Sequence, residues 1–280
     1  MSWRMRVVHT TGYDYASPVT SSYNEARLTP RNDARQNVVL SRVETTPSTR
    51  SYRYTDYWGT VVTAFDLHAP HTGLEVVGSS VVETEASVLP EEEVSWEQLC
   101  GERVTDRFTE VLSTSAYVPM HRPLRAVAAK LRKGCTPEQA ARAAARWVHE
   151  EMSYVPGTTG VHTSAVQAWG ERKGVCQDYA HLTLLLVRAM GIPSRYVSGY
   201  LHPRRSADVG ETVAGQSHAW VEVWTGGWWG LDPTNDVDVN EQHVTVGVGR
   251  DYHDVPPLKG IYSGGGSTAL DVVVEITRLA

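Results

Sequence analysis

The first part of the chain alternates short apolar stretches with turn-forming residues. These stretches are rich in Val, Thr and Tyr, are bounded by Pro, Gly, Asn or Asp, and cover residues 4–15, 37–47, 60–69 and 74–84. Short stretches of β-branched and aromatic residues between turn residues are typical of antiparallel β-strands. We therefore predict an N-terminal β-sandwich domain over residues 1–87.

The pattern changes after this region. The segment ASVLPEEEVSWEQLCGE, which begins at Ala86, is acidic and irregular, and it predicts a connecting region over residues 88–120. Helix signals follow, with Thr136 as an N-cap, Pro137 at the first helical position and Gln139 three residues after the cap. They predict a helix through the segment EQAARAAARWVHEEM.

A second helix is predicted to begin at Cys176 and to run to about Met190, because Gly191 and Pro193 follow it as stop signals. Stretches of strand composition come next, at residues 194–202, 217–224, 227–234 and 268–279. Helices followed by an antiparallel sheet are typical of the α+β class. We predict an α+β domain over residues 121–280 that includes the C-terminal strand.

Composition and charge narrow the possible functions. The chain has 280 residues, 41% of them hydrophobic, and a formal net charge of −6 with both signs interspersed. The sequence has no basic stripe of the kind that binds nucleic acid, so we expect no nucleic-acid partner. No segment approaches the length of a membrane span, and the first residues lack the apolar stretch of a signal peptide. We expect a cytoplasmic protein that does not bind a membrane.

The cysteines supply the first candidate for chemistry. Cys100, Cys135 and Cys176 are an odd set without CxxC spacing, which argues against a disulfide framework and against a thiolate zinc site. Cys176 directly precedes the apolar stretch of a predicted helix, and a helix N-terminus lowers the pKa of a thiol because its N–H groups and dipole favour negative charge. A small buried cysteine would occupy the same position, so position alone leaves both interpretations open.

A thiol nucleophile needs a base. His181 is nearest in the sequence, but a separation of five residues along a helix rotates it by about 140° away from Cys176, so it cannot easily reach the sulfur. His218 lies in the predicted strand SHAWVEVW, and catalytic Cys–His pairs are adjacent in space rather than in sequence. We take His218 as the candidate base. The alternative is a half-buried histidine with satisfied hydrogen bonds.

Asp232 is the candidate that orients His218. If residues 225–227 form a three-residue turn, Trp224 pairs with Trp228, and Asp232 falls on the same face of the hairpin as His218. A two-residue turn would shift the register by one residue and place the two side chains on opposite faces. The alternative for Asp232 is a turn-initiating aspartate before proline.

Four tryptophans, Trp220, Trp224, Trp228 and Trp229, cluster on the same predicted hairpin. Their indoles could exclude water from an acyl-enzyme. Alternation along the strands predicts instead that at least half of them cover the core of the sheet, and we expect this second role to dominate.

Four segments, GVCQDYAHL, GIPSRYVSGYL, SHAWVEVW and WWGLDPTN, resemble in order and spacing the core of the transglutaminase-like superfamily. The segment SSYNEARLTPR resembles the β-rich N-terminal domain of the bacterial branch, and GVGRDYHDVPPLKG resembles its C-terminal segment. The resemblance covers nearly the whole chain. It implies a papain-like fold, with a helix carrying the cysteine packed on an antiparallel sheet, in which Cys176 is the nucleophile, His218 the base and Asp232 the residue that orients it.

The resemblance leaves the oxyanion hole open, and Tyr154 and the backbone N–H of Cys176 are candidates for it. Animal members respond to calcium, but the loop that starts at Asp236 has Glu241 where an EF-hand needs glycine and Gly247 where it needs the closing glutamate. We therefore expect no metal ion and no cofactor.

The superfamily includes cross-linking enzymes, proteases, amidases and inactive members, so the fold does not choose the reaction. We expect cysteine-dependent acyl transfer on amide or peptide bonds through a thioester, with hydrolysis as the first choice. Transamidation of protein glutamine is the second choice and a non-catalytic peptide-binding role the third. The expected partner is a peptide or protein amide substrate, and the sequence leaves the oligomeric state open.

Overall fold

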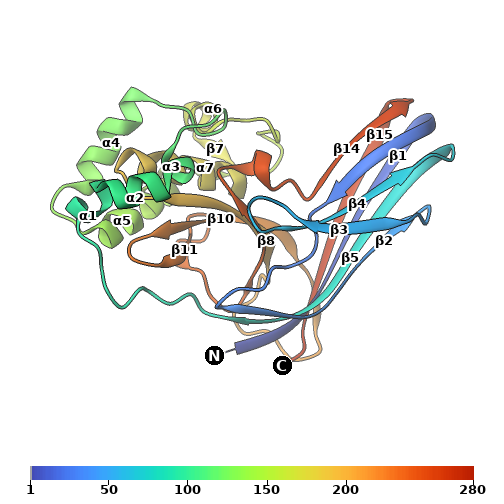
Figure 1. Cartoon of the computed structure of the whole chain (residues 1–280), viewed down its shortest axis with the longest axis horizontal. Coiled ribbons are helices and arrows are strands. Elements are labelled where there is room, and N and C mark those ends of the chain that lie inside the picture. The colour runs from blue at the N-terminus through green and yellow to red at the C-terminus, as the bar shows by residue number, and fades with distance from the viewer. Residues whose placement is uncertain (1) are drawn as a thin grey trace.

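Figure 1 shows the computed structural model, which describes residues 2–280. A long first strand, β1 (Ser2–Ala26), connects the two halves of a large antiparallel sheet. Alternate residues in its first half are buried, among them Trp3 and Val7, as expected for a strand with one face on a core. The pairing of β1 with the strand at His71–Glu85 shifts in register between Asp14 and Val19. Beyond that point β1 pairs mainly with two different strands.

The first half of β1 pairs with β5 (His71–Glu85) and β15 (Ser267–Arg278), and its second half pairs with β4 (Val61–Leu67) and β14 (Leu258–Gly264). The remaining strands of this sheet are β2 (Gln36–Thr46), β3 (Ser51–Thr55) and β9 (Thr212–Ala214). Within residues 2–280 these eight strands form one hydrogen-bonded sheet. The prediction that residues 1–87 are rich in β-strands is confirmed. The bounds of a separate β-sandwich domain stay a prediction, and strands β9, β14 and β15 of this sheet come from beyond residue 87.

The C-terminal strand has its partner in this sheet. β15 pairs with β1 over most of its length, from Met5↔Arg278 to Tyr15↔Ser267. The sequence pattern grouped this strand with residues 121–280, whereas its hydrogen bonds join it to the N-terminal sheet. Pairing between the two ends of a chain depends on long-range packing, which a local hydrophobic pattern does not encode.

The connecting region predicted over residues 88–120 is partly helical. It contains the short helices α1 (Trp96–Cys100), α2 (Glu102–Arg107) and α3 (Thr109–Leu112). Ser95 and Gln98 form a capping box at the start of α1. This signal was present in the sequence, where the acidic residues before it outweighed it.

Four longer helices follow along the described part of the chain. They are α4 (Arg122–Arg132), α5 (Pro137–Glu151), α6 (Ala165–Glu171) and α7 (Cys176–Ala189). Two of them, α5 and α7, are predicted from the sequence. The Thr136–Gln139 capping box forms at the start of α5, and α7 ends just before Gly191, which has a positive φ of 88°. Both helix predictions are confirmed.

The second sheet carries α7 on one face. Its order is β12 (Val237–Asp238), β11 (Trp228–Asp232), β10 (Gln216–Trp224), β8 (Ser194–Leu201) and β13 (His243–Gly249). Tyr196, Ala219 and Val221 of this sheet share a buried apolar cluster with α7 and the helices around it. A helix packed on an antiparallel sheet in this way confirms the predicted α+β class.

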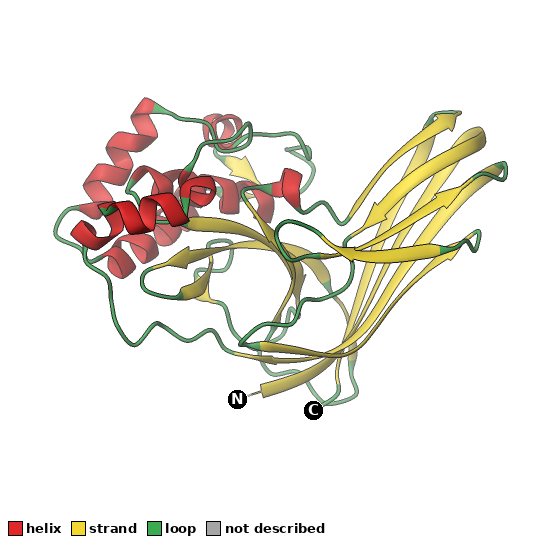
Figure 2. Ribbon diagram, viewed as in Figure 1, coloured by secondary structure: helices red, strands yellow, loops and turns green. Residues whose placement is uncertain are grey.

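Figure 2 shows the helices on one side of the second sheet and the large sheet on its other side. A separate cluster joins the two sheets, with Trp3 and Ile276 from the large sheet and Tyr200 and Val244 from the second one. Residues from both sheets can therefore line one cavity between them. None of the helices within residues 2–280 has the length and apolarity that crossing a membrane requires.

Candidate active site

Cys176 is the first residue of α7, and the residues before it fix its position. Val175 is extended at the N-cap, and its N–H donates to Asp178 Oδ2 at 2.8 Å. A Cβ at Gly174 would lie 2.5 Å from the same oxygen, so the tight approach of this segment requires glycine. The N–H of Cys176 belongs to the first helical turn, where no intrahelical acceptor exists. This N–H is thus free to bind an anion beside the thiol.

His218 and Asp232 lie together on the β10–β11 hairpin. Trp224 pairs with Trp228, which is the register that a three-residue turn predicts. The two candidate side chains therefore share a face, and His218 Nε2 lies 2.8 Å from Asp232 Oδ2. Both side chains are buried. The geometric argument from the sequence is confirmed, while the chemical roles of these residues remain predictions.

The Asp232 carboxylate is held by further donors. The backbone N–H groups of Thr234 and Asn235 donate to Oδ1 at 3.0 and 3.2 Å, and Asn235 Nδ2 lies 2.7 Å from Oδ2. His243 Nε2 lies 3.2 Å from Oδ2. Burial alone would raise the pKa of Asp232, but the charge and hydrogen bond of His218, and then those of His243, lower it below its usual range. The carboxylate therefore stays ionised in a buried site.

The same ion pair sets the charge of His218. Burial opposes the charged imidazolium, but the Asp232 carboxylate and then the adjacent Cys176 raise the pKa of His218 to about 10. His218 is an imidazolium at neutral pH. Because Nε2 faces Asp232, Nδ1 is the ring nitrogen that remains for proton exchange with another group.

Cys176 and His218 line one cavity of about 300 Å³. Its walls come from both halves of the molecule, with Gln177 and Tyr196 from the helix and second sheet, and with Leu270 from the large sheet. Among the described residues that line it, none is Asp, Glu, Lys or Arg. Apart from Cys176 and His218, the cavity is therefore lined by a mixture of apolar side chains and neutral polar ones.

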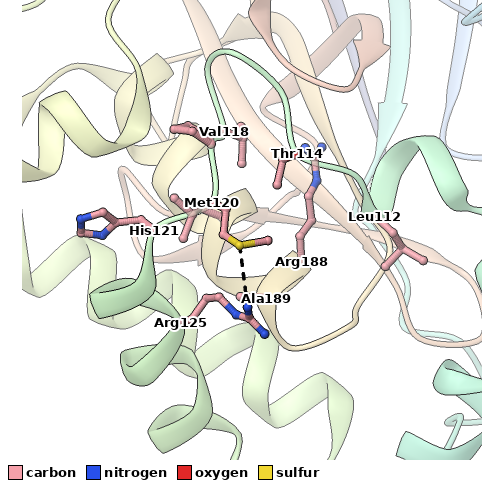
Figure 3. Close-up of a pocket in the computed structure, with 10 residues that line it drawn as sticks. Leu112, Thr114, Val118, Met120, His121, Arg125, Arg188 and Ala189 are labelled. Carbon is pink, nitrogen blue, oxygen red and sulfur yellow. Dashed lines mark hydrogen bonds between the residues drawn. The ribbon is translucent and has the colours of Figure 1, made fainter.

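A second cavity, of about 190 Å³, lies at the other end of α7 (Figure 3). Arg188 and Ala189 of α7 line it together with Met120, His121 and Arg125. At a rise of about 1.5 Å per residue, the ends of α7 are about 20 Å apart. This cavity therefore cannot present a substrate to Cys176.

The other sequence candidates take structural positions. His181 is fully buried, its Nε2 accepts a hydrogen bond from the Tyr252 N–H at 3.2 Å, and burial, followed by the charge of Arg188, lowers its pKa to about 3. It is a neutral core histidine, in agreement with the helix-rotation argument. Cys100 is exposed and Cys135 is partly buried; neither lines the cavity at Cys176.

Tyr154, the predicted oxyanion donor, lies on β6 (Ser153–Tyr154) beside β7 (Lys173–Gly174) and is 46% exposed. Burial of its phenol and the charge of the nearby Cys176 raise its pKa, so the hydroxyl keeps its proton at neutral pH. Tyr154 is close to the thiol but does not line the 300 Å³ cavity. Its role remains a prediction.

Sequence reasoning missed Tyr196 and His243. Tyr196 is buried on β8 and lines the cavity, and burial and then the charge of Cys176 raise its pKa well above the ordinary value. His243 reaches Asp232 from β13. Nothing in the local pattern marked either residue, because each reaches the site through pairing with a distant strand.

His218, Asp232 and His243 place one ligand atom each within 4.8 Å of one another, a donor set that could hold a metal ion. Their hydrogen bonds to one carboxylate oxygen already account for the cluster without an ion. The acidic segment from Asp236, which fails the EF-hand pattern, uses its carboxylates in ion pairs. Asp236 Oδ2 lies 3.4 Å from Arg146 Nε, and Asp238 pairs with Arg142. The expected absence of a metal and of a cofactor stays a prediction.

The tryptophans of the hairpin do not form the cavity wall. Trp220 and Trp229 are buried in the sheet, and Trp229 Nε1 donates to Thr225 Oγ1 at 2.8 Å. Trp224 and Trp228 pack on Phe108. None of the four is among the described residues that line the cavity, which favours their role in the core over the exclusion of water.

Comparison with known proteins agrees with this fold. Residues 125–233 match the Transglutaminase-like superfamily, and residues 5–83 match the Bacterial transglutaminase-like N-terminal region. An uncharacterised protein of Mycobacterium leprae (strain TN) is 63% identical over 99% of this chain and 100% of its own length. The chain belongs to the transglutaminase-like superfamily, whose members are typically cysteine enzymes.

Two more comparisons bear on the fold and the activity. A candidate cysteine protease from Cytophaga hutchinsonii has a TM-score of 0.74 with 22% identity, over 100% of this chain and 93% of its own, and supports the fold alone. A Pseudomonas aeruginosa (PAO1) protein named protein-glutamine gamma-glutamyltransferase is 35% identical over 51% of this chain and 23% of its own length.

Proposed function

We propose that this protein hydrolyses an amide or peptide bond through a thioester on Cys176, with His218 as acid and base and Asp232 as its orienting partner. The observation that carries the proposal is the pair of His218 and Asp232, in which Nε2 lies 2.8 Å from Oδ2. His218 also lines the same cavity as the Cys176 thiol at the start of α7. A positioned nucleophile, a base beside it and a third group that orients the base are the parts that covalent catalysis needs.

The proposed reaction has two steps. The Cys176 thiolate adds to the carbonyl carbon, and the resulting oxyanion is stabilised by the free N–H of Cys176, with Tyr154 as a candidate second donor. Imidazolium His218 gives its proton to the leaving amine, the C–N bond breaks, and a thioester remains. Neutral His218 then takes a proton from water as the water attacks the thioester, and the acid product leaves Cys176 as a thiolate.

The lining of the cavity favours hydrolysis over transamidation. The residues that line it, within the described part of the chain, include no carboxylate that would attract a lysine ammonium group. An amine acceptor must compete with water at about 55 M, which requires a binding site or a dry channel. Transamidation is the second candidate, and the name of the Pseudomonas aeruginosa relative favours it. A non-catalytic peptide-binding role has less support, because the cysteine, histidine and aspartate are all present in one site.

The test is the partition of product between water and an amine. With any substrate that the enzyme turns over, a lysine analogue is titrated with and without calcium, and free acid and amine conjugate are both measured. Hydrolysis predicts that acid dominates and that EDTA has no effect. If the conjugate dominates at millimolar amine, or if calcium is required, transamidation replaces hydrolysis.

The expected cytoplasmic location, and the expected lack of nucleic-acid or membrane partners, stay predictions.

A further inference from the structure

We propose that the substrate is an extended peptide whose acyl side carries an apolar, uncharged side chain, and that the large sheet selects it through Tyr13, Leu270 and Val272. This inference rests on the proposed function of Cys176, because it assigns the chemistry of the substrate at the same site. It concerns the acyl side of the substrate, which forms the thioester with Cys176 in the first step and is released by water in the second.

The first observation is a continuous apolar stripe on β15. Alternate residues Leu270, Val272, Val274 and Ile276 share one face of the strand. Val274 and Ile276 are 6% and 0% exposed, because the second sheet covers them, whereas Leu270 and Val272 are 59% and 46% exposed. The two exposed residues line the cavity that contains Cys176. The buried half of the stripe packs on the second sheet, and its exposed half lies in the cavity, where a substrate can cover it.

The second observation is the absence of charge on this wall. On β1, Tyr13 pairs with Leu270 and Thr11 with Val272, and both side chains line the cavity beside His9. Burial lowers the pKa of His9 to about 4, so it is neutral at pH 7. A charged substrate side chain placed here would lose part of its water and would find no oppositely charged group on this wall. An apolar side chain would instead bury its surface against the wall.

The third observation favours a peptide over a small amide. The carbonyl groups of Val274 and Arg278 accept hydrogen bonds from Gly215 and Gly210, so both face the β9 side of β15. Because direction alternates along a strand, the peptide groups of Leu270 and Val272 face the same side. β9 pairs only with residues 275–277, and within residues 2–280 no strand pairs with this edge at residues 270–272. An open edge beside a cavity can bind an extended peptide through its main chain.

The test uses peptide probes that carry one electrophilic group in place of the scissile amide, so that Cys176 is labelled without turnover. The two residues before that group are Leu in one probe and Lys or Glu in matched probes. We expect the Leu probe to label Cys176 about tenfold faster or more, the range that one apolar contact can discriminate. N-methylation of the probe main chain at these residues should slow labelling several-fold, because it removes the donors.

Val272→Glu and Val273→Glu form a matched pair of variants. The two valines are 46% and 47% exposed but lie on opposite faces of β15. Val272→Glu should abolish the preference for the Leu probe and speed the Lys probe, while Val273→Glu should match the unmodified protein. Leu270→Glu, at a position 59% exposed, repeats the test at a second site of the wall.

The outcomes separate the two proposals. Equal labelling by the Leu, Lys and Glu probes, or equal effects of Val272→Glu and Val273→Glu, would overturn the inference even if the protein hydrolyses peptides. Labelling by the main-chain-methylated probe at an equal or faster rate would overturn the assignment to the strand edge. Selective labelling in a protein that turns over no peptide would overturn the hydrolase and leave the recognition of apolar peptides standing.

Discussion

Asp232 is the residue on which the candidate site converges. Its two oxygens accept hydrogen bonds from two backbone N–H groups and from the side chains of His218, Asn235 and His243. Satisfying a buried carboxylate in this way fixes its position and keeps it charged. It can therefore hold His218 in one tautomer and stabilise the imidazolium that the proposed reaction needs.

Replacing Asp232 with Asn should lower turnover on the order of 10⁴-fold, because His218 loses the anion that orients it and stabilises its charge. Steady-state kinetics would measure the loss, and circular dichroism would establish that the fold is retained. Asp236→Asn is the matched control, since Asp236 lies in the turn directly after β11 and pairs with Arg146 rather than with His218. Full activity of the Asp232 variant would show that Asp232 is only a turn residue.

The His218–Asp232 pair should also make stability depend on pH. The pKa of His218 is raised from 6.5 to about 10 on folding, so its contribution is complete below pH 6.5 and is lost as the pH rises through about 10. The pKa of Asp232 is lowered, so its contribution is present above its ordinary pKa of 3.8 and is lost as the pH falls below that range.

Denaturant unfolding between pH 6 and pH 10 measures this dependence. In a Cys176→Ala background, which removes the thiol beside the pair, the free energy of unfolding should fall more steeply with pH when His218 is present than in a His218→Gln variant. Parallel curves for the two proteins would mean that folding does not shift the pKa of His218.

At the scale of elements, local signals predicted what depends on local geometry. The Thr136–Gln139 capping box located the start of α5, and the length of the turn at residues 225–227 gave the register that places His218 beside Asp232. The capping box at Ser95 is a local signal of the same kind for α1, but it directly follows an acidic, irregular segment. The pattern of the sequence therefore predicts two of the longer helices, α5 and α7, and the hairpin of the site.

Other elements could not be derived from the sequence, because they depend on contacts between distant segments. His243 reaches Asp232 only when β13 pairs with β8, and Leu270 reaches the cavity only when β15 pairs with β1. Strand order is set by packing across the whole molecule, and many orders fit the same alternation of apolar residues. For the same reason the sequence identified the three candidate catalytic residues but not the walls around them.

At the scale of the whole molecule, the N-terminal sheet is part of the candidate site as well as its support. It covers one face of the second sheet through Trp3, Val7 and Ile276, and it contributes Tyr13 and Leu270 to the cavity. The two halves of the molecule therefore depend on each other for stability and for the proposed recognition of substrate.

Removing residues 1–85 should make the remaining chain aggregate or unfold at a lower temperature. β14 and β15 would lose β1, their hydrogen-bonded partner, and the apolar face at Val274 and Ile276 would lose part of its cover. Light scattering and thermal unfolding would measure the change. A truncated protein that stays monomeric and as stable as the full chain would contradict the dependence of the two halves.

The most direct test of Cys176 as the nucleophile is its rate of alkylation by iodoacetamide at about pH 6, well below the usual thiol pKa of about 8.5. The folded protein is alkylated and then digested, and mass spectrometry of the peptides gives the rates at all three cysteines in one experiment. Cys100 is the internal control, because it is exposed and access does not limit its reaction. We predict that Cys176 reacts at least about tenfold faster than Cys100 and Cys135, because a thiolate and not a thiol is the reacting species. Equal rates at the three cysteines would contradict it.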